Sequence, residues 1–269
     1  MNQLKTSLLA ALALSGVAFT ALAVSRGCIN PVPAPTYEVP SASTPIDHTA
    51  YGRLLKKHVN AKGFVDYLGF KGDEKEFNQY LELLSKNPPA ANWSKAEQMA
   101  YWINAYNAYT IRLILDHYPV SSIKDIGSKI KIPLVTTPWA AKFFSIGGEK
   151  MSLDNIEHGI LRKKYDDPRI HFALVCASIS CPSLRNEAYT AEKLDRQLED
   201  QGKDFLNNPA KNKVGRTKAQ LSKYFDWYKG DWEKNNQSVA KWVNKYSTTP
   251  MDAKAEVSYL DYNWNLNKQ

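Results

Sequence analysis

The sequence predicts a single α+β domain in which a buried central helix packs on a small sheet. The 269-residue chain is 43% hydrophobic and contains 7 Trp, 15 Tyr and 9 Phe, which is enough apolar material for a packed core. Segments with helical spacing of apolar residues alternate with short apolar runs, as in mixed folds. Pro-rich sequence is concentrated near the N-terminus, so the remainder is expected to fold as one unit.

The first 46 residues are expected to precede the domain. Residues 1–23 combine Lys5 with an apolar run and a small-residue pattern at Ala21–Ala23, which indicates a secretory signal peptide. Residues 24–46 hold five prolines and are expected to form an extended tether, outside the core, that leads into a domain at 47–269. The alternatives to cleavage are a retained membrane anchor and lipidation of Cys28. Only these two would hold the mature form at a membrane.

Each of these alternatives predicts an exported protein of the periplasm or cell envelope. The net charge of +8 suits an anionic envelope surface. Nucleic acid is not an expected partner, because the chain has no RNP pattern, zinc-finger spacing or arginine-rich run. No cofactor is expected.

The first half of the domain reads as helices with one short strand. A helix is expected over 47–59, a strand over 63–70 and a helix over 73–87 that stops at two prolines. The strongest helix covers 94–119, where Ser94 and Glu97 form a capping box and Pro119 ends the helix. Apolar residues surround this helix nearly completely, which predicts a central, buried position.

The second half alternates between the two kinds of element. A hairpin is expected over 142–153 with its turn at Gly147 and Gly148. An amphipathic helix follows over 152–165, with Ser152 as its cap. Residues 169–176 are apolar on both alternating faces, which favours an interior strand. Another helix is expected over 190–208.

Two polar residues fall in apolar surroundings. Glu157 lies inside the apolar arc of the helix at 152–165, so its carboxylate must be paired or have a raised pKa. It is either a buried ion-pair partner or an acid/base or histidine-orienting group. Asn104, on the central helix, is interpreted either as a tie to neighbouring loops or as a hydrogen-bond donor to an oxyanion.

The segment 169–184 adds two cysteines and a histidine. Cys176 ends the predicted strand, and Cys181 precedes a proline at a potential helix start, where a thiol's pKa is lowered. His171 and Cys176 would face opposite sides of a regular strand, so His158 is the other candidate base. The two cysteines form either a disulfide or free thiols. No metal site is expected, because the C-x4-C spacing is not that of a tight metal knuckle.

Four motifs in order resemble the DUF547 family, a domain of unknown function: "YWINAYNAYTIRLIL", "SLDNIEHGILR", "DPRIHFALVCASISCPSL" and "YLDYNWNLN". The resemblance covers about 50–266. In the last motif Asn263 and Asn265 replace the acid and serine of the family pattern. The resemblance implies papain-like or transglutaminase-like cysteine enzymes as relatives. It also favours Cys176 over Cys181 as nucleophile, since plant members carry serine at the second position.

Two functions from different classes follow. The first is a cysteine-dependent hydrolase or acyl-transfer enzyme acting on peptide or envelope polymer, with Cys176 or Cys181 as nucleophile and a histidine at 158 or 171 as base. Glu157 would orient that histidine and Asn104 would stabilise an oxyanion. The second is a non-catalytic envelope module that binds protein or glycan through an aromatic groove, with the two cysteines in a disulfide or buried.

Overall fold

A computed structural model describes residues 32–127 and 137–269. The predicted signal peptide at 1–23 and the candidate lipidation site Cys28 lie outside the described residues. Helices and two small sheets make up the fold, which confirms the predicted α+β class. Within the described ranges, no helix combines the length and apolar character needed to cross a bilayer.

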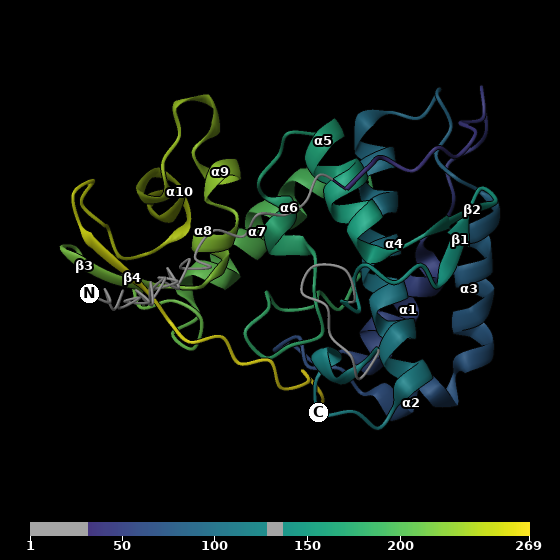
Figure 1. The fold of residues 1–269 in the computed structure, drawn as a ribbon, viewed down its shortest axis with the longest axis horizontal. Coiled ribbons are helices and arrows are strands. Elements are labelled where there is room, and N and C mark those ends of the chain that lie inside the picture. Colours follow the sequence, from purple (N-terminus) through teal and green to yellow (C-terminus); the bar gives the residue numbers. More distant parts are fainter. Residues whose placement is uncertain (1–31, 128–136) are drawn as a thin grey trace, which may run out of the picture.

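The N-terminal half consists of helices packed beside one hairpin (Figure 1). Its elements are α1 (Thr49–His58), α2 (Tyr67–Gly72), α3 (Glu74–Lys86), α4 (Lys95–His117), the 3-10 turn η1 (Ile123–Asp125), β1 (Phe144–Ile146) and β2 (Glu149–Met151). Strands β1 and β2 pair antiparallel around Gly147 and Gly148, which both adopt the positive φ angles that glycine tolerates. The predicted hairpin is therefore confirmed.

The C-terminal half contains shorter helices and a second strand pair. Its elements are η2 (Asn155–Leu161, a π-helix), α5 (Arg162–Lys164), α6 (Ile170–Ala173), α7 (Leu194–Asn207), β3 (Lys218–Leu221), α8 (Tyr224–Trp227), α9 (Lys229–Trp232), η3 (Lys234–Asn236), α10 (Val239–Tyr246) and β4 (Glu256–Tyr259). Strands β3 and β4 pair in parallel.

Helix α4 is the central, buried helix that the sequence predicts. Its capping box is complete: the Ser94 hydroxyl accepts from the Glu97 amide at 3.2 Å, and the Glu97 carboxylate accepts from the Ser94 amide. Tyr109 stacks on Phe144 of β1 with 3.8 Å between ring centroids. Helix α4 thereby packs on the small sheet, and η2 packs against it.

The predicted interior strand at 169–176 is wrong. Residues Ile170–Ala173 form the short helix α6, and the chain becomes extended only from Leu174. The helical turn begins directly after Pro168, whose fixed φ suits a helix start. Continuous apolar character indicates burial, and both the helix and the extended run are buried.

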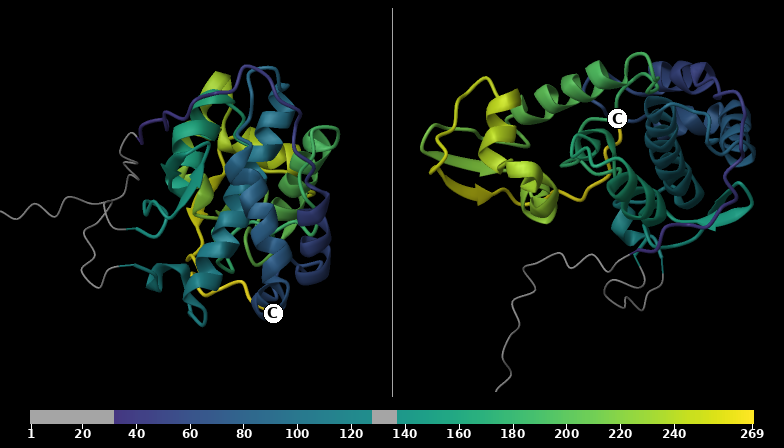
Figure 2. Two further views of the ribbon diagram at one scale, coloured as in Figure 1. Left: turned by 90° about the vertical axis from the view of Figure 1, so that its right-hand side faces the viewer. Right: turned by 90° about the horizontal axis from the view of Figure 1, so that it is seen from above.

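Residues 32–46, which we call the strap, pack along the outside of the helices (Figure 2). They contain no helix or strand. The indole of Trp93 donates to the Ser43 carbonyl at 3.0 Å, and Lys163 donates to the Val32 carbonyl at 2.6 Å. The ring of Tyr37 lies 5.7 Å from that of Trp102, centroid to centroid. These contacts dock residues 32–46 of the expected tether on the domain.

The C-terminal tail returns from β4 and lies against both halves (Figure 1). The Leu266 amide donates to Ser121 at 2.8 Å, and the Asn267 amide donates to Ala177 at 3.1 Å. Val65, before α2, donates to the Asn267 carbonyl at 2.8 Å. These bonds hold the tail between the helical half and the segment after α6.

Candidate active site

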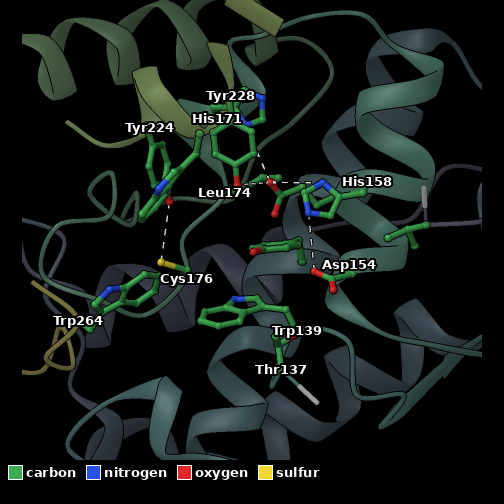
Figure 3. Close-up of a pocket in the computed structure, with 14 residues that line it drawn as sticks. Thr137, Trp139, Asp154, His158, His171, Leu174, Cys176, Tyr224, Tyr228 and Trp264 are labelled. Atoms are coloured by element: carbon green, nitrogen blue, oxygen red, sulfur yellow. Dashed lines mark hydrogen bonds and ion pairs between the residues drawn. The ribbon is translucent and has the colours of Figure 1, made fainter. Parts of the chain in front are cut away.

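A cavity of about 330 Å³ lies between η2, α6, α8 and the tail (Figure 3). Its walls carry acid, base, sulfur and aromatic groups: Val32, Tyr106, Thr137, Trp139, Asp154, Glu157, His158, His171, Leu174, Cys176, Tyr224, Trp227, Tyr228 and Trp264. Four of the six residues named by the sequence analysis, Glu157, His158, His171 and Cys176, meet here. A concave, largely apolar site with a few convergent polar groups is the usual form of a ligand site.

The π-helical geometry of η2 places two neighbouring side chains in the cavity wall. The Ser152 hydroxyl accepts from the Asn155 amide at 3.2 Å at the start of this helix, as the sequence predicts for its cap. Residue 162 then bonds back to the Glu157 carbonyl, five residues earlier. The wider turn lets Glu157 and His158 both line the cavity.

Glu157 is 6% exposed and accepts a hydrogen bond from the Tyr228 hydroxyl at 2.7 Å. Its Oε1 lies 3.9 Å from Nδ1 of both His158 and His171. Burial acts to raise the pKa of Glu157, but the two histidines and the Tyr228 hydroxyl outweigh it and hold the pKa below its ordinary value. The carboxylate therefore remains ionised between two imidazoles. No arginine or lysine of the described chain lies within ion-pair distance of this carboxylate.

His158 is held on both sides of its ring. Arg162 donates to Nδ1 at 3.2 Å, so this nitrogen is the acceptor and the proton resides on Nε2. Nε2 lies 3.8 Å from Oδ1 of Asp154, one helical turn earlier. Burial raises the pKa of Asp154 to about 6. Two carboxylates near one histidine thus have pKa values displaced in opposite directions, a pattern typical of acid/base sites.

His171 is 1% exposed and stacks on Tyr228 with 3.7 Å between ring centroids. Its Nε2 donates to Asp231 at 2.8 Å, and Asp231 also binds Arg162 through two bonds of 2.6 and 3.0 Å. Burial lowers the pKa of His171, although the carboxylates of Asp231 and Glu157 oppose this shift. Because α6 replaces the expected strand, His171 and Cys176 line the same cavity instead of facing opposite sides.

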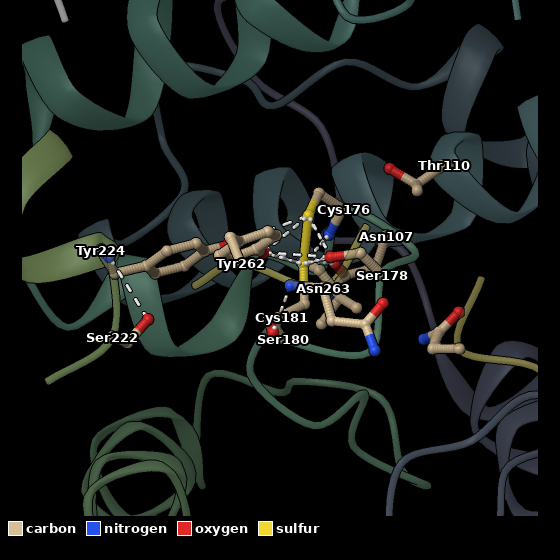
Figure 4. Close-up of a disulfide and its surroundings, with 12 residues drawn as sticks. Asn107, Thr110, Cys176, Ser178, Ser180, Cys181, Ser222, Tyr224, Tyr262 and Asn263 are labelled. Atoms are coloured by element: carbon tan, nitrogen blue, oxygen red, sulfur yellow. Dashed lines mark hydrogen bonds between the residues drawn. A yellow bond between two sulfur atoms is a disulfide. The ribbon is translucent and has the colours of Figure 1, made fainter. Parts of the chain in front are cut away.

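Cys176 and Cys181 are joined in a disulfide (Figure 4). Hydroxyl groups surround the Cys176 sulfur: those of Ser178 and Tyr262 lie at 3.3 Å and that of Tyr224 at 3.8 Å. Cys176 lines the cavity, whereas Cys181 does not. Cys181 makes no described helix N-cap; its sulfur accepts from the Cys176 amide at 2.9 Å.

Cys176 and His158 lie on opposite sides of the cavity (Figure 3). Among the described residues, no hydrogen bond joins Cys176 to a histidine. A direct cysteine–histidine dyad is therefore absent from this part of the chain. The arrangement instead leaves space for a ligand between sulfur and imidazole.

Asn104 lies outside the cavity wall. Its amide nitrogen donates to the Tyr189 carbonyl at 2.8 Å, and its oxygen accepts from the Tyr189 amide at 2.9 Å. Asn107 makes a similar pair of bonds to Ala173 and Val175. Both amides fix the chain on either side of the cysteines. Asn104 does not line the cavity, so it is not placed to donate to an oxyanion there.

Several wall residues were not identified from the sequence. Asp154 precedes His158 by four residues, a helical spacing that would have indicated contact. Tyr224 of α8 and Tyr228, between α8 and α9, lie four residues apart in "YFDWYKGDW". Asp231 of α9 is not part of the wall but binds His171 and Arg162. Their packing against η2 depends on contacts across more than 60 positions, which periodicity does not reveal.

No group of three or more His, Cys, Asp or Glu side chains in residues 32–127 and 137–269 is arranged to hold a metal ion. Comparisons with known proteins give one match: residues 90–206 match the family model described as "Protein of unknown function, DUF547". No curated protein and no solved structure matches. The matched region contains α4, η2, α6 and both cysteines, but not the tyrosines of α8.

Proposed function

Since the chain belongs to the DUF547 family, which is described without a function, its activity must be inferred from its own site, and we propose that it is a cysteine-dependent hydrolase or acyl-transfer enzyme. The observation that carries this proposal is the cavity that brings Cys176 together with Asp154, Glu157 and His158 of the η2 segment. In the disulfide-bonded form the nucleophile is masked, so the active species is the dithiol.

In the reduced form, hydroxyl donors stabilise the nucleophile. The hydroxyls of Ser178 and Tyr262 lie 3.3 Å from the Cys176 sulfur, and hydrogen bonds to a charged group favour that charged form. A thiolate at this position attacks the carbonyl carbon of a substrate lying across the cavity. The products of this step are a thioester on Cys176 and a leaving group that needs a proton.

His158 is placed to supply that proton from the opposite wall. The neutral ring carries hydrogen on Nε2, because Arg162 donates to Nδ1, so it becomes an acid only after it has taken up the thiol proton of Cys176. Once this imidazolium has protonated the leaving group, the neutral ring accepts a proton from water, which then hydrolyses the thioester and restores the thiolate and the imidazolium. Glu157 and His171 act as positioning residues: Glu157 stabilises positive charge on His158, and His171 connects Glu157 to the Asp231–Arg162 pair.

Export would give this enzyme peptide or envelope polymer as substrate, and we include periplasmic or envelope location in the proposal. The support is the sequence pattern of residues 1–23. The test is N-terminal sequencing of protein recovered from the envelope. Cleavage predicts a mature start at Val24, and an intact Met1 or Asn2 would contradict it.

The catalytic proposal is tested with two serine variants that both lose the disulfide. Cys181→Ser leaves only the Cys176 thiol at this site, and Cys176→Ser leaves only the Cys181 thiol. Each is incubated with an acyl p-nitrophenyl ester, and the modified peptide is mapped by mass spectrometry. Cys181→Ser and reduced wild type should carry the acyl group on Cys176, whereas Cys176→Ser should carry none at this site. Equal acylation of both variants would contradict the proposal.

A second function, a non-catalytic binding module, is favoured by the disulfide together with the aromatic walls. Trp139, Trp227 and Trp264 line the cavity beside three tyrosines. Aromatic faces of this kind can bind sugars and peptides without catalysing a reaction. This alternative predicts that both variants bind the same ligands as wild type and that neither forms an acyl adduct.

A further inference from the structure

A second cavity, of about 530 Å³, lies beyond the disulfide on the side of Cys181. It is formed by the turn at 61–64, the stretch at 178–183, the end of α7 with the loop that follows it, and Asn267 of the tail. Lys211 of that loop is 8% exposed and lines it. A buried ammonium group in a cavity of this size is unusual, because lysine is seldom buried without a charged partner.

The ammonium of Lys211 has only weak partners within the described chain. Its Nζ donates to the Ser183 hydroxyl at 3.3 Å and lies 6.0 Å from the ring centroid of Phe205. No described carboxylate lies within ion-pair distance of it; Asp204 acts on it only from farther away. The cost of burying this charge is therefore not offset by an internal anion.

The backbone fixes Lys211 in place. Its amide and that of Asn212 both donate to the Asn208 carbonyl at 2.9 Å. The Asn212 side chain donates to the Phe205 carbonyl at 2.8 Å and accepts from the Ser222 amide at 2.9 Å. The loop is thus held at both ends, so the ammonium is presented to the cavity by a preorganised turn.

A second donor faces the same space. Asn267 is 5% exposed and lines the cavity. Its Oδ1 accepts a hydrogen bond from the Tyr67 hydroxyl at 2.8 Å, and this bond fixes the orientation of the side-chain amide. Its Nδ2 donates to no described residue. A cavity with one buried cation and one unused amide donor is complementary to a small anion.

We propose that this second cavity binds a ligand through a single carboxylate, which accepts hydrogen bonds from Lys211 and Asn267. A singly charged anion is favoured over phosphate because Asp204 also lines the cavity and opposes a doubly charged group. The free carboxylate of a peptide or of a sugar acid has the required chemistry. This site is independent of the activity assigned to the first cavity.

The test uses N-acetylalanine and its uncharged amide as a matched ligand pair. Binding to full-length protein is followed by chemical-shift changes of the Asn267 side-chain amide and by calorimetry. N-acetylalanine should bind saturably in the millimolar range, and the amide should bind at least tenfold more weakly. Because burial lowers the pKa of Lys211 to about 8, affinity should fall between pH 7 and pH 9.5.

Two variants complete the test. Lys211→Met keeps the length of the side chain and removes the charge, so it should lose at least tenfold in affinity while remaining as stable as wild type. Lys71→Met, at an exposed position on α2, should bind as wild type does. The proposal is overturned if N-acetylalanine shows no saturable binding, if the amide binds equally well, or if Lys211→Met retains wild-type affinity. Even if Lys211→Met does not fold, the comparison of N-acetylalanine with its amide on wild-type protein tests the proposal.

Discussion

At the scale of single residues, the cavity is organised by the carboxylate of Glu157. Among the described residues it is the one acid that faces both imidazoles, at 3.9 Å from each, and it accepts a hydrogen bond from Tyr228. A buried carboxylate in an apolar surrounding could be anticipated from the helical arc, since the arc is local in sequence. Its partners could not, because Tyr228 and His171 arrive from other elements.

Glu157→Gln tests whether this charge supports chemistry. Glutamine still accepts from Tyr228, so the free energy of unfolding should change by only about 1 kcal/mol. The rate at which the acyl group leaves Cys176 should fall at least tenfold, because the positive charge on His158 is no longer stabilised by the carboxylate of Glu157. Stopped-flow acylation and deacylation rates measure this, with the exposed Glu192→Gln as control. Full activity in Glu157→Gln would remove Glu157 from the mechanism.

Asp154 provides a test of pH dependence. Its pKa is raised to about 6 by burial, against an ordinary value near 3.8. The folded state therefore binds more protons than the unfolded state between these values, and wild-type stability should fall as pH rises through this window. Asp154→Asn should remove that loss and be more stable than wild type at pH 7, by at most about 3 kcal/mol.

The difference between Asp154→Asn and wild type should vanish below about pH 4, where the wild-type carboxyl is protonated in both states. Urea unfolding at a series of pH values measures it. Asp261→Asn, at an exposed position, is the matched control. A stability difference that is the same at pH 4 and pH 7 would show that burial does not perturb Asp154.

At the scale of elements, η2 and the strap form one edge of the site. Gly159 of η2 faces the strap: a Cβ there would lie 3.0 Å from the Pro33 carbonyl oxygen and 3.3 Å from Pro35. Val32, at the end of the strap, lines the cavity. The strap composition predicts an extended chain, but its docking depends on this close approach, which composition does not encode.

Gly159→Ala should loosen the strap. The added methyl group requires the strap to move by a few tenths of an ångström, although alanine itself favours a helix. Amide hydrogen exchange at residues 36–43 should become faster than in wild type. Gly230→Ala on α9, where a Cβ meets nothing within 4 Å, is the matched control. Unchanged exchange in Gly159→Ala would show that the strap does not depend on this contact.

Periodicity and end signals explain which elements could be predicted. Helix α4 has a local start signal and a proline stop, and the hairpin has two glycines at its turn. The errors fall at 63–70 and 169–176, where short apolar runs do not distinguish a strand from a helix. There the structure has the helices α2 and α6. The π-helical turn in η2, which brings the adjacent residues Glu157 and His158 into one cavity wall, has no sequence signature that the helical wheel detects.

At the scale of the whole molecule, the cavity is assembled where the helical half, the short helices and the C-terminal tail meet. Trp264 comes from the tail, Tyr106 from α4 and Tyr228 from between α8 and α9. The disulfide lies between the two cavities, since Cys176 lines the first and Cys181 the second. The central claim is that Cys176 is an activated nucleophile when this disulfide is open.

The most direct test of that claim is the pH dependence of Cys176 alkylation in Cys181→Ser. The rate of reaction with iodoacetamide is measured from pH 5 to pH 10 on folded protein, with the labelled peptide mapped to separate Cys176 from Cys28. The account predicts a midpoint clearly below about 8.5, the ordinary pKa of a cysteine thiol. It also predicts that, as the pH is lowered, the labelling rate of Cys176 falls less in folded protein than in unfolded protein. A midpoint at or above 8.5, or labelling only after unfolding, would contradict the account and leave the binding module as the better description.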